Sequence, residues 1–327
     1  MTPLEVLPRE GAGAEVLGVD VSAMTVGEWN QIEAAFAAFG LLVFRDQILT
    51  ERDHVEFAQR WGAPVPPDRR AHPTEPEIAV RDATSPSEPG SQSTQGVWYA
   101  DRSYALRPPL GSVEIAREIP AGGATTIFAD THAAFDTLSS GTQRALEALR
   151  AVHTHPVPGG DVEESRHPIV IHHPVSGRKT LFVNPTFTTS VEDMDEREGL
   201  GLLNQLYDHC QQPEFLTTVE WELGMVVIWD SRAVWEFSPR ATEQPTMHRV
   251  TISGTELRPA IAPAKKDPTL TQRAGATLAG GILTAAMTGI AEVIDPERVK
   301  HDIEIVSEAP EPDDLPDFDF GELPPLD

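Results

Sequence analysis

Residues 225–237 read MVVIWDSRAVWEF, and the fold class is decided in this stretch. Its first six residues, MVVIWD, form a short apolar run of the kind that a buried strand needs. Similar short segments recur from Val97 onward, separated by glycine and proline turns. They read LGSVEIARE (110–118), ATTIFAD (124–130), RKTLFVN (178–184), TTVEWEL (217–223) and HRVTISGTEL (248–257). This pattern predicts a mainly β chain, folded as an antiparallel barrel or sandwich.

Helical patterns precede the strands and interrupt them. Thr25 caps a helical pattern that Gly40 ends, and LLVFRDQ (41–47) after it predicts a buried strand. Thr50 opens a second helix, and residues 63–95 have the Pro, Ser, Glu and Asp content of a loop. Two more helices are expected at about residues 131–151 and 195–211. The sequence therefore predicts a β domain with flanking helices.

The composition argues against several classes of partner. Acidic side chains outnumber Lys and Arg by 51 to 25, and the resulting charge of -26 repels phosphate backbones and anionic lipid surfaces. We therefore expect neither a nucleic acid nor a membrane as partner. The single cysteine, Cys210, excludes an internal disulfide, and the N-terminus lacks the pattern of a signal peptide. Both features favour a cytoplasmic protein.

The composition changes after about residue 259. A linker with Pro and Lys leads into an Ala/Gly-rich helical pattern and then into an acidic, proline-rich tail without Lys or Arg after Lys300. We therefore expect a β domain over residues 1–258 and a C-terminal extension over residues 259–327. The tail has the composition of a solvated, disordered segment. The alternative is that it docks on the same chain or on another, or covers a site.

Several blocks resemble the TauD/TfdA family, whose members are similar to taurine dioxygenase. They are GLLVFRDQILT (40–50), HHPVSGRKTLFVNPTFTT (172–189), VVIWDSRAVWEF (226–237) and MHRVTISG (247–254). Their order and spacing match the family over about residues 3–258. The resemblance implies a double-stranded β-helix, or jelly roll, framed by helices, together with the Fe(II) and α-ketoglutarate chemistry of that family.

The resemblance implies that this sequence has other residues at the family's metal-ligand positions. The family holds iron with a His-x-Asp pair and a distant histidine, which bind one face of the ion. The block Trp-Tyr-Ala-Asp at 98–101 matches the first pair, so Tyr99 stands at the histidine position and Asp101 is kept. Glu236 stands where the distant histidine is expected. The resemblance thus implies that Tyr99, Asp101 and Glu236 are vestigial ligand positions that hold no metal.

The resemblance also points to co-substrate and substrate positions. Pro245 lies four residues before Arg249, where the family has its α-ketoglutarate arginine, and proline offers no guanidinium to a carboxylate. We therefore expect no cofactor, because ligands for both Fe(II) and α-ketoglutarate are missing. Arg249, Thr125 and Phe187 are predicted to bind substrate, and Arg249 favours an anionic small molecule.

Three functions stay open for such a site. The main hypothesis is a metal-independent, non-oxidative enzyme in which Tyr99, Asp101 and Glu236 carry acid/base chemistry on an anionic small molecule. Ordinary Fe(II)/α-ketoglutarate oxygenase activity is then not expected. The second hypothesis is a dioxygenase with an unusual Tyr/Asp/Glu metal site, and the third is an inactive binding or scaffold protein. The sequence identifies no substrate, and the resemblance leaves a homo-oligomer open.

The remaining histidines are interpreted as hydrogen-bonded packing residues. They are His153, His155, His167, His172, His173 and His248. His248 and Arg249 are neighbours in a predicted strand, so their side chains should point to opposite faces. The pair His54 and Glu56 is a poor chelate, because residues two apart on a helix do not share a face.

Overall fold

The computed structural model describes residues 3–67, 70–82, 97–157, 160–239 and 243–260. Within these residues the helices are α1 (Val26–Phe39), α2 (Glu51–Gln59), α3 (Thr131–Thr137), α4 (Ser140–Glu147), α5 (Glu196–Cys210) and the 3-10 helix η1 (Pro213–Phe215). The first strands are β1 (Glu5–Pro8), β2 (Ala14–Leu17), β3 (Leu41–Phe44), β4 (Ala79–Arg81), β5 (Trp98–Tyr99), β6 (Gly111–Glu118), β7 (Thr125–Asp130), β8 (Arg150–Pro156) and β9 (Val162–Pro168). The later strands are β10 (Val170–His172), β11 (Lys179–Leu181), β12 (Thr188–Val191), β13 (Leu216–Glu220), β14 (Val226–Asp230), β15 (Val234–Phe237), β16 (Thr246–Ile252) and β17 (Arg258–Pro259).

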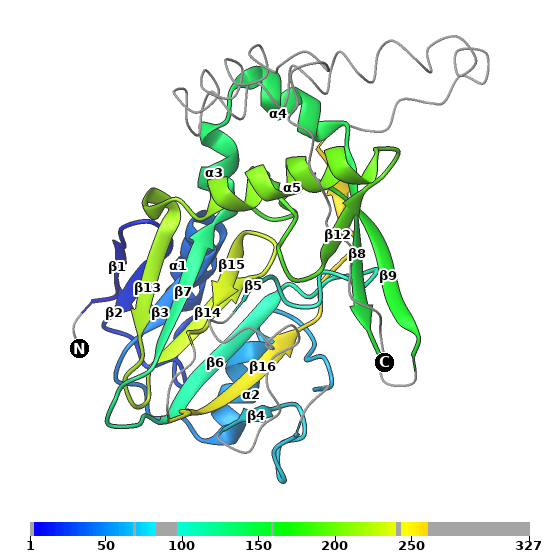
Figure 1. Ribbon diagram of the computed structural model, residues 1–327. Coiled ribbons are helices and arrows are strands. Elements are labelled where there is room, and N and C mark those ends of the chain that lie inside the picture. The colour runs from blue at the N-terminus through cyan, green and yellow to red at the C-terminus, as the bar shows by residue number, and fades with distance from the viewer. Residues whose placement is uncertain (1–2, 68–69, 83–96, 158–159, 240–242, 261–327) are drawn as a thin grey trace, which may run out of the picture.

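Two β-sheets form the centre of the described structure (Figure 1). One has seven strands in the order β1-β2-β3-β14-β6-β16-β4, and the other has four in the order β13-β7-β15-β5. Two three-stranded sheets, β11-β10-β17 and β12-β8-β9, lie beside them. All pairings are antiparallel except that of β2 with β3. The expected mainly β architecture with flanking helices is confirmed.

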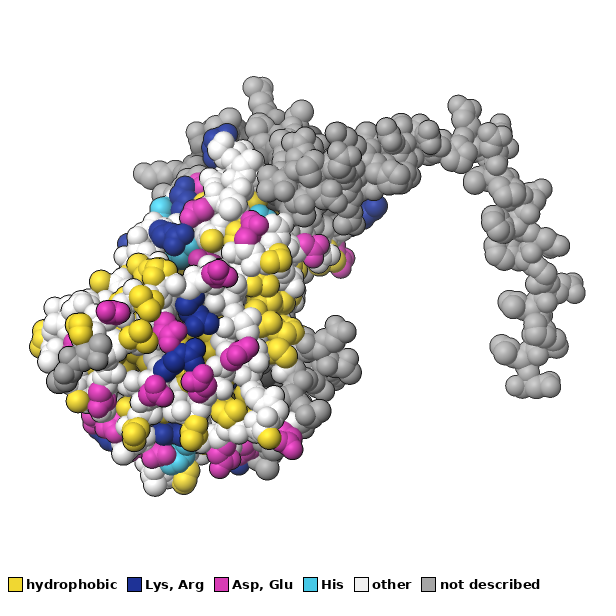
Figure 2. Space-filling model, turned by 90° about the vertical axis from the view of Figure 1, so that its left-hand side faces the viewer, with side chains coloured by type: hydrophobic (Ala, Val, Ile, Leu, Met, Phe, Trp, Pro, Cys, Tyr) yellow, Lys and Arg dark blue, Asp and Glu magenta, His cyan; other side chains and the backbone are white. Residues whose placement is uncertain are grey.

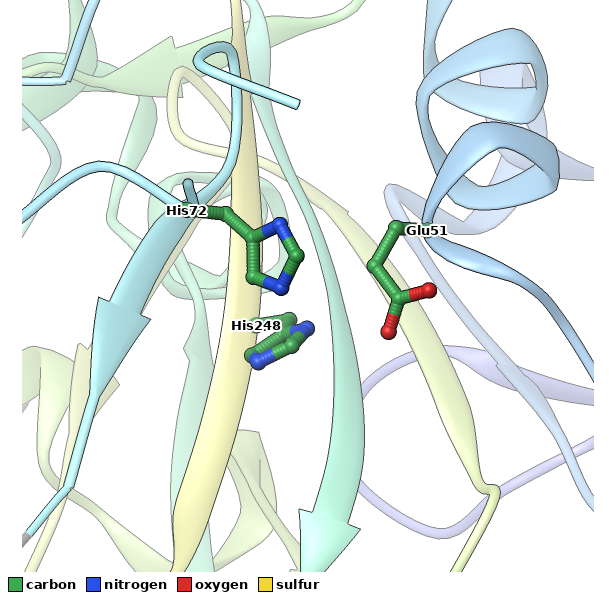
Figure 3. A group of neighbouring side chains, drawn as sticks. All are labelled: Glu51, His72 and His248. Carbon is green, nitrogen blue, oxygen red and sulfur yellow. The ribbon is translucent and has the colours of Figure 1, made fainter. Parts of the chain in front are cut away.

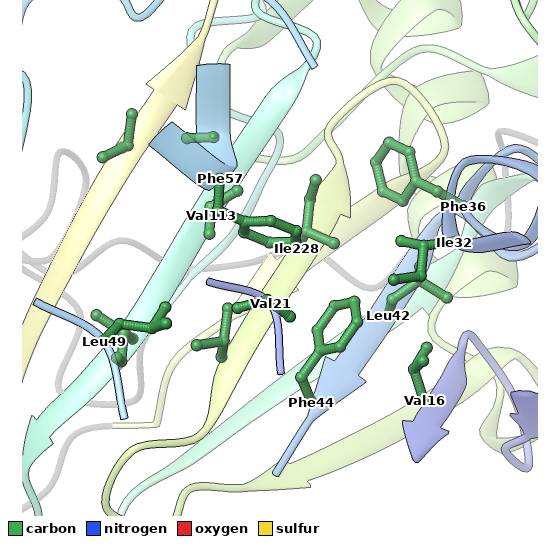
Figure 4. Packing of buried hydrophobic residues seen from close by; sticks show 14 of the residues in the cluster. Val16, Val21, Ile32, Phe36, Leu42, Phe44, Leu49, Phe57, Val113 and Ile228 are labelled. Atoms are coloured by element: carbon green, nitrogen blue, oxygen red, sulfur yellow. The ribbon is translucent and has the colours of Figure 1, made fainter. Parts of the chain in front are cut away.

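The apolar run of β3 is buried on both of its faces. Leu42 and Phe44 pack into the cluster that α1 and α2 build on one side of the large sheet (Figure 4). Leu41 and Val43 belong instead to the cluster that also contains Phe128 of the four-stranded sheet. Because alternate residues of a strand point to opposite faces, a strand with apolar neighbours on both sides needs a continuous apolar sequence. This requirement explains the LLVF run.

Both predicted helix starts are confirmed, and each is built as a capping box. The side chain of Thr25 accepts a hydrogen bond from the backbone N–H of Glu28, and Thr50 accepts one from Asp53 in the same way. In each case the backbone N–H of the threonine donates in return to the acidic side chain, as a capping box requires. Gly40 ends α1 with a φ of 68°, a conformation that glycine adopts at low cost. The second cap fixes Glu51 at the start of α2.

Two expectations from the sequence are wrong in detail. The single helix expected at 131–151 is two helices, because the extended backbone of Leu138 ends α3 and Ser139 caps α4. The expected loop at 63–95 contains β4, which pairs with β16 through Val80 and His248. Short edge strands of this kind carry little periodic signal, since only three residues are involved.

The division of the chain at residue 258 stays a prediction. β17 pairs with β10 and carries the described structure to Ala260. The expected helix and tail of the C-terminal extension lie outside the described residues.

Charged side chains of both signs are interspersed on the described part of the face in Figure 2. Ion pairs join charged side chains of the described structure, as between Arg45 and both Glu15 and Glu222. None of the helices within the described ranges is long and apolar enough to span a bilayer.

The cap of α2 gives a stability test. Thr50→Ala should lower the free energy of unfolding by about 1 kcal/mol, because the N–H of Asp53 loses its acceptor. Urea denaturation measures this loss. Thr50→Ser keeps the hydroxyl and should restore most of the stability, whereas equal losses in the two variants would show that the cap is not the cause.

Candidate active site

Strand pairing brings the predicted site residues Tyr99 and Glu236 side by side. They are direct partners in the antiparallel pair of β5 with β15, so their side chains leave the same face of the four-stranded sheet. Asp101 follows two residues after Tyr99. Across the barrel, Arg249 of β16 is the strand partner of Glu114 of β6. Tyr99, Asp101, Glu114 and Arg249 line one pocket, which Glu236 reaches through Arg249.

The Arg249 guanidinium is the centre of a buried ion-pair network. Its Nη2 atom donates to Glu236 Oε1 at 2.7 Å and to Glu114 Oε2 at 3.2 Å, and Nη1 lies 3.4 Å from Asp101 Oδ1. The guanidinium carbon also lies 4.7 Å from the ring centroid of Trp229, within the range of a cation–π contact. These contacts fix Arg249 at the inner wall of the barrel.

The charges of this network do not cancel. Asp101, Glu114 and Glu236 bring three carboxylates, whereas Arg249 and Arg81 bring two guanidiniums, Arg81 pairing with Glu114 at 3.3 Å. The Oε2 atom of Glu236 is buried and has no hydrogen-bond partner within the described part of the chain. One further positive charge or proton therefore fits at Glu236.

The pKa values follow from this arrangement. Burial raises the pKa of Glu236 to about 7, and Asp101 and Glu114 act in the same direction, although Arg249 lowers it. Burial opposes the charge on Arg249, but Glu114 and Glu236 outweigh it and raise the pKa of the guanidinium well above its ordinary value. Arg249 thus stays charged while Glu236 titrates near neutral pH.

Of the two other residues predicted to bind substrate, Phe187 lines the pocket and Thr125 does not. Phe187 lines the pocket and packs in one buried cluster with Tyr99 and Tyr104. Thr125 begins β7 opposite Glu220, away from the residues that form the pocket wall. Its predicted role, like those of Tyr99, Asp101, Glu236, Arg249 and Phe187, stays a prediction.

The oxygen donors in the barrel fit a hard cation. Carboxylate and phenol oxygens suit ions such as manganese, magnesium or iron(III) better than they suit softer ions. Asp101 is oriented by Ser112, whose Oγ donates to Asp101 Oδ2 at 3.0 Å. Asp101 and Glu236 contact the two Nη atoms of Arg249, and the Oε2 atom of Glu236 has no hydrogen-bond partner among the described residues.

A second group of metal-ligand types lies on the other face of the large sheet. Glu51, His72 and His248 place one ligand atom each within 4.8 Å of one another. In Figure 3 the two rings and the carboxylate face one another from α2, from the segment before β4, and from β16. The alternation along β16 predicted for His248 and Arg249 is thus confirmed, since Arg249 lines the barrel pocket.

The sequence interpretation missed this group, because His248 was taken for a packing residue. Its three members lie 21 and 176 positions apart in the chain, so no spacing motif marks them. Burial lowers the pKa of His248 to about 4, helped by Arg117 and His72, so its ring is neutral at physiological pH. A hydrogen bond from its own backbone N–H lowers the pKa of Glu51. Two imidazoles and one carboxylate form a ligand set suited to a transition metal.

Other histidines are hydrogen-bonded as predicted. His153 contacts Ser103 Oγ at 3.1 Å, His167 contacts the carbonyl of Ala105 at 3.0 Å, and His173 contacts Asp230 at 2.8 Å. His54 is buried and contacts the carbonyl of Val113, while Glu56 pairs with Arg52 on the helix surface. The prediction that His54 and Glu56 do not chelate an ion is consistent with this geometry.

Comparison with known proteins shows the family to which this chain belongs. The chain belongs to the family described as taurine catabolism dioxygenase TauD, TfdA family, with residues 4–235 matching. It is 32% identical over 254 residues to the alpha-ketoglutarate-dependent dioxygenase cnsM of Penicillium expansum, covering 70% of each chain. It is 30% identical over 252 residues to an (S)-phenoxypropionate/alpha-ketoglutarate-dioxygenase of Sphingobium herbicidovorans, covering 68% of this chain and 84% of that one. A crystal structure of a taurine dioxygenase from Burkholderia xenovorans matches with a TM-score of 0.70 and 30% identity, over 79% of this chain and 93% of that chain.

These findings correct the main functional hypothesis. A metal-independent, non-oxidative enzyme is wrong as the leading interpretation, because the relatives are α-ketoglutarate-dependent dioxygenases and the chain holds a Glu/His/His group able to bind a metal. The expectation that ordinary oxygenase activity is absent is wrong for the same reason. Oxygen atoms are themselves metal ligands, so a tyrosine and two carboxylates do not exclude a bound metal. That Tyr99 and Glu236 stand at the family's histidine positions stays a prediction from the sequence.

The ion-pair network predicts a pH-dependent cost of removing Arg249. At pH 8, Arg249→Gln should lower the free energy of unfolding by about 3 kcal/mol, because buried carboxylates lose their cation. The folded-state pKa of Glu236 lies above the unfolded value of 4.5, so the folded protein takes up this proton first as the pH falls. Without Arg249 the pKa of Glu236 rises further, so the cost should shrink as the pH falls from about 8 to about 6, where Glu236 takes up its proton in the folded wild type as well.

Denaturation in the presence of a chelator, at several pH values, measures this cost. In a Glu236→Gln background the same arginine substitution should cost less and lose most of its pH dependence. A cost that is the same in both backgrounds and at all pH values would contradict the network.

Proposed function

We propose that the chain is a metal-dependent oxygenase that consumes α-ketoglutarate and oxidises a small anionic molecule in the barrel pocket. The observation that carries the proposal is that Asp101 and Glu236 both pair with the buried Arg249 guanidinium, while Tyr99 is the strand partner of Glu236. Among the described ion pairs, three carboxylates share the two guanidiniums of Arg81 and Arg249. Support comes from the relatives, which are named as α-ketoglutarate-dependent dioxygenases.

Tyr99, Asp101 and Glu236 would hold the metal ion. A bound ion supplies the centre at which a keto acid and dioxygen react. The chain contributes the ligand orientation, since Ser112 holds Asp101 and Arg249 holds Glu236 by hydrogen bonds of 3.0 Å and 2.7 Å. Support of this kind around the ligands sets their direction and basicity.

Arginines at the pocket wall favour anionic ligands. Arg81, Arg102 and Arg249 line the pocket, and a guanidinium matches the two oxygens of a carboxylate. Phe187 and Tyr104 add an aromatic wall against which an apolar substrate part can pack. The names of two relatives include phenoxypropionate and taurine, both of which carry an acidic group. We therefore propose a carboxylate or sulfonate substrate, and we keep the cytoplasm as the proposed location.

The test is α-ketoglutarate turnover by the purified protein. Protein loaded anaerobically with Fe(II), or separately with Mn(II), is exposed to oxygen with α-ketoglutarate and a panel of carboxylates and sulfonates, including taurine and phenoxypropionate. Release of CO₂ from α-ketoglutarate should match formation of oxidised product one to one. Asp101→Asn and Glu236→Gln should each lower this turnover by about 100-fold or more, because each removes a metal ligand.

Glu220→Gln is the matched control, because Glu220 is an exposed acidic residue of β13 outside the pocket. This variant should keep full turnover. Wild-type protein that releases no CO₂ with either metal and any member of the panel would refute the proposal, as would unchanged turnover in both pocket variants.

A further inference from the structure

We propose that Glu51, His72 and His248 form a divalent transition-metal site outside the barrel, between α2 and the outer face of the seven-stranded sheet. The site is distinct from the oxygenase pocket, because His248 and Arg249 leave opposite faces of β16. The observation that carries it is the convergence of two imidazoles and a carboxylate from three separate elements (Figure 3).

Each ligand is held by backbone structure. Glu51 is the first residue of α2, whose start is fixed by the Thr50 cap. The backbone N–H of His72 donates to the carbonyl of Ile78 at 2.8 Å, and Ala71 forms a β-bridge with Ala79. His248 lies within β16. The backbone around each ligand is thus fixed before any ion binds, which reduces the entropy cost of assembling the site.

The distances between the three ligand atoms are close to those between two ligands of one bound ion. Nitrogen and carboxylate oxygen lie about 2.0 to 2.2 Å from a zinc-type ion, so two ligands of one ion are about 3.4 Å apart. The three atoms here lie within 4.8 Å of one another. The largest separation therefore has to shorten by about 1.4 Å at most, which is within the reach of side-chain rotation, because Glu51 and His72 are only partly buried.

The ligand types select the class of metal. Imidazole suits zinc, nickel, cobalt, copper and iron, whereas calcium and magnesium prefer sites made wholly of oxygen. Glu51 and His72 are partly exposed and His248 is buried, so one side of the site faces solvent. Water can complete the coordination there.

Two neighbours influence the affinity. Thr74 contacts Nδ1 of His72 through its backbone N–H, which donates at 3.5 Å, and through Oγ1 at 3.2 Å, so Nε2 is the ring nitrogen available to a metal ion. Arg117 donates to Nδ1 of His248 at 3.3 Å and lies 3.7 Å from Glu51. Its positive charge competes with a metal ion, so we expect that removing Arg117 strengthens metal binding.

A bound ion would connect three parts of the chain. It would join the start of α2, the segment before β4 and the middle of β16. Because a ligand that binds only the folded state stabilises that state, the thermal unfolding temperature should rise with metal concentration. The proposed role is therefore that of a stabilising metal site on the outer face of the sheet.

The test is titration of tag-free, metal-free protein with Co(II), followed by visible absorption, and with Zn(II), followed by calorimetry. His72→Ala and Glu51→Gln should each weaken binding at this site by 10-fold or more and abolish the rise in unfolding temperature. Arg117→Gln should bind more tightly than wild type. His172→Ala is the matched control, because His172 is an exposed histidine of β10 bonded only to backbone carbonyls among the described residues, and should bind as wild type does.

Two further measurements distinguish loss of this metal site from a folding defect and from loss of metal in the barrel pocket. Unfolding of His72→Ala in a chelator should match wild type, which excludes a folding defect. Asp101→Asn should keep this binding event, since it alters only the barrel pocket. Equal Co(II) affinity in wild type and His72→Ala, or loss of the event in Asp101→Asn instead, overturns the proposal. Neither result bears on the proposed oxygenase function, because metal binding and not turnover is measured.

Discussion

The charge on Arg249 is the constraint on which the interior of the barrel depends. Three carboxylates lie around it, and Glu114 and Glu236 are almost fully buried. Buried carboxylates are costly without a cation, so the guanidinium allows them to lie together. Among the described ion pairs the carboxylates still outnumber the guanidiniums of Arg249 and Arg81 by one, and burial raises the pKa of Glu236 to about 7, so Glu236 can take up a proton near neutral pH.

The two faces of the large sheet carry different groups of functional side chains. On the inner face, Arg249 and Glu114 contribute to the pocket, whereas on the outer face His248 meets α2 and the segment before β4. The two-residue period of a strand separates these environments at adjacent positions. Two chemically different groups, one rich in oxygen and one rich in imidazole, can therefore lie on the two sides of a single strand without sharing ligands.

Much of the fold could be predicted from the sequence, because the features concerned depend on residues that are close together in the chain. The threonine caps of α1 and α2 and the doubly buried run of β3 are readable from neighbouring residues. The proximity of Tyr99 and Glu236 could be predicted, because both residues lie in sequence blocks that resemble the family. The ion pairs of Arg249 with Glu114 were not predicted, since they depend on the register of β6 against β16. The group of Glu51, His72 and His248 was missed because tertiary packing alone brings these residues together.

The most direct test of the account is the identity of the ligands to the catalytic metal. X-ray absorption at the iron edge, on His72→Ala protein loaded with one equivalent of iron, reports the first shell of the barrel site without a contribution from the outer group. An ion held by Tyr99, Asp101 and Glu236 should show a shell of oxygen ligands without the outer-shell scattering of imidazole rings. Clear imidazole scattering in this variant would contradict the assignment of Tyr99, Asp101 and Glu236 as the metal ligands.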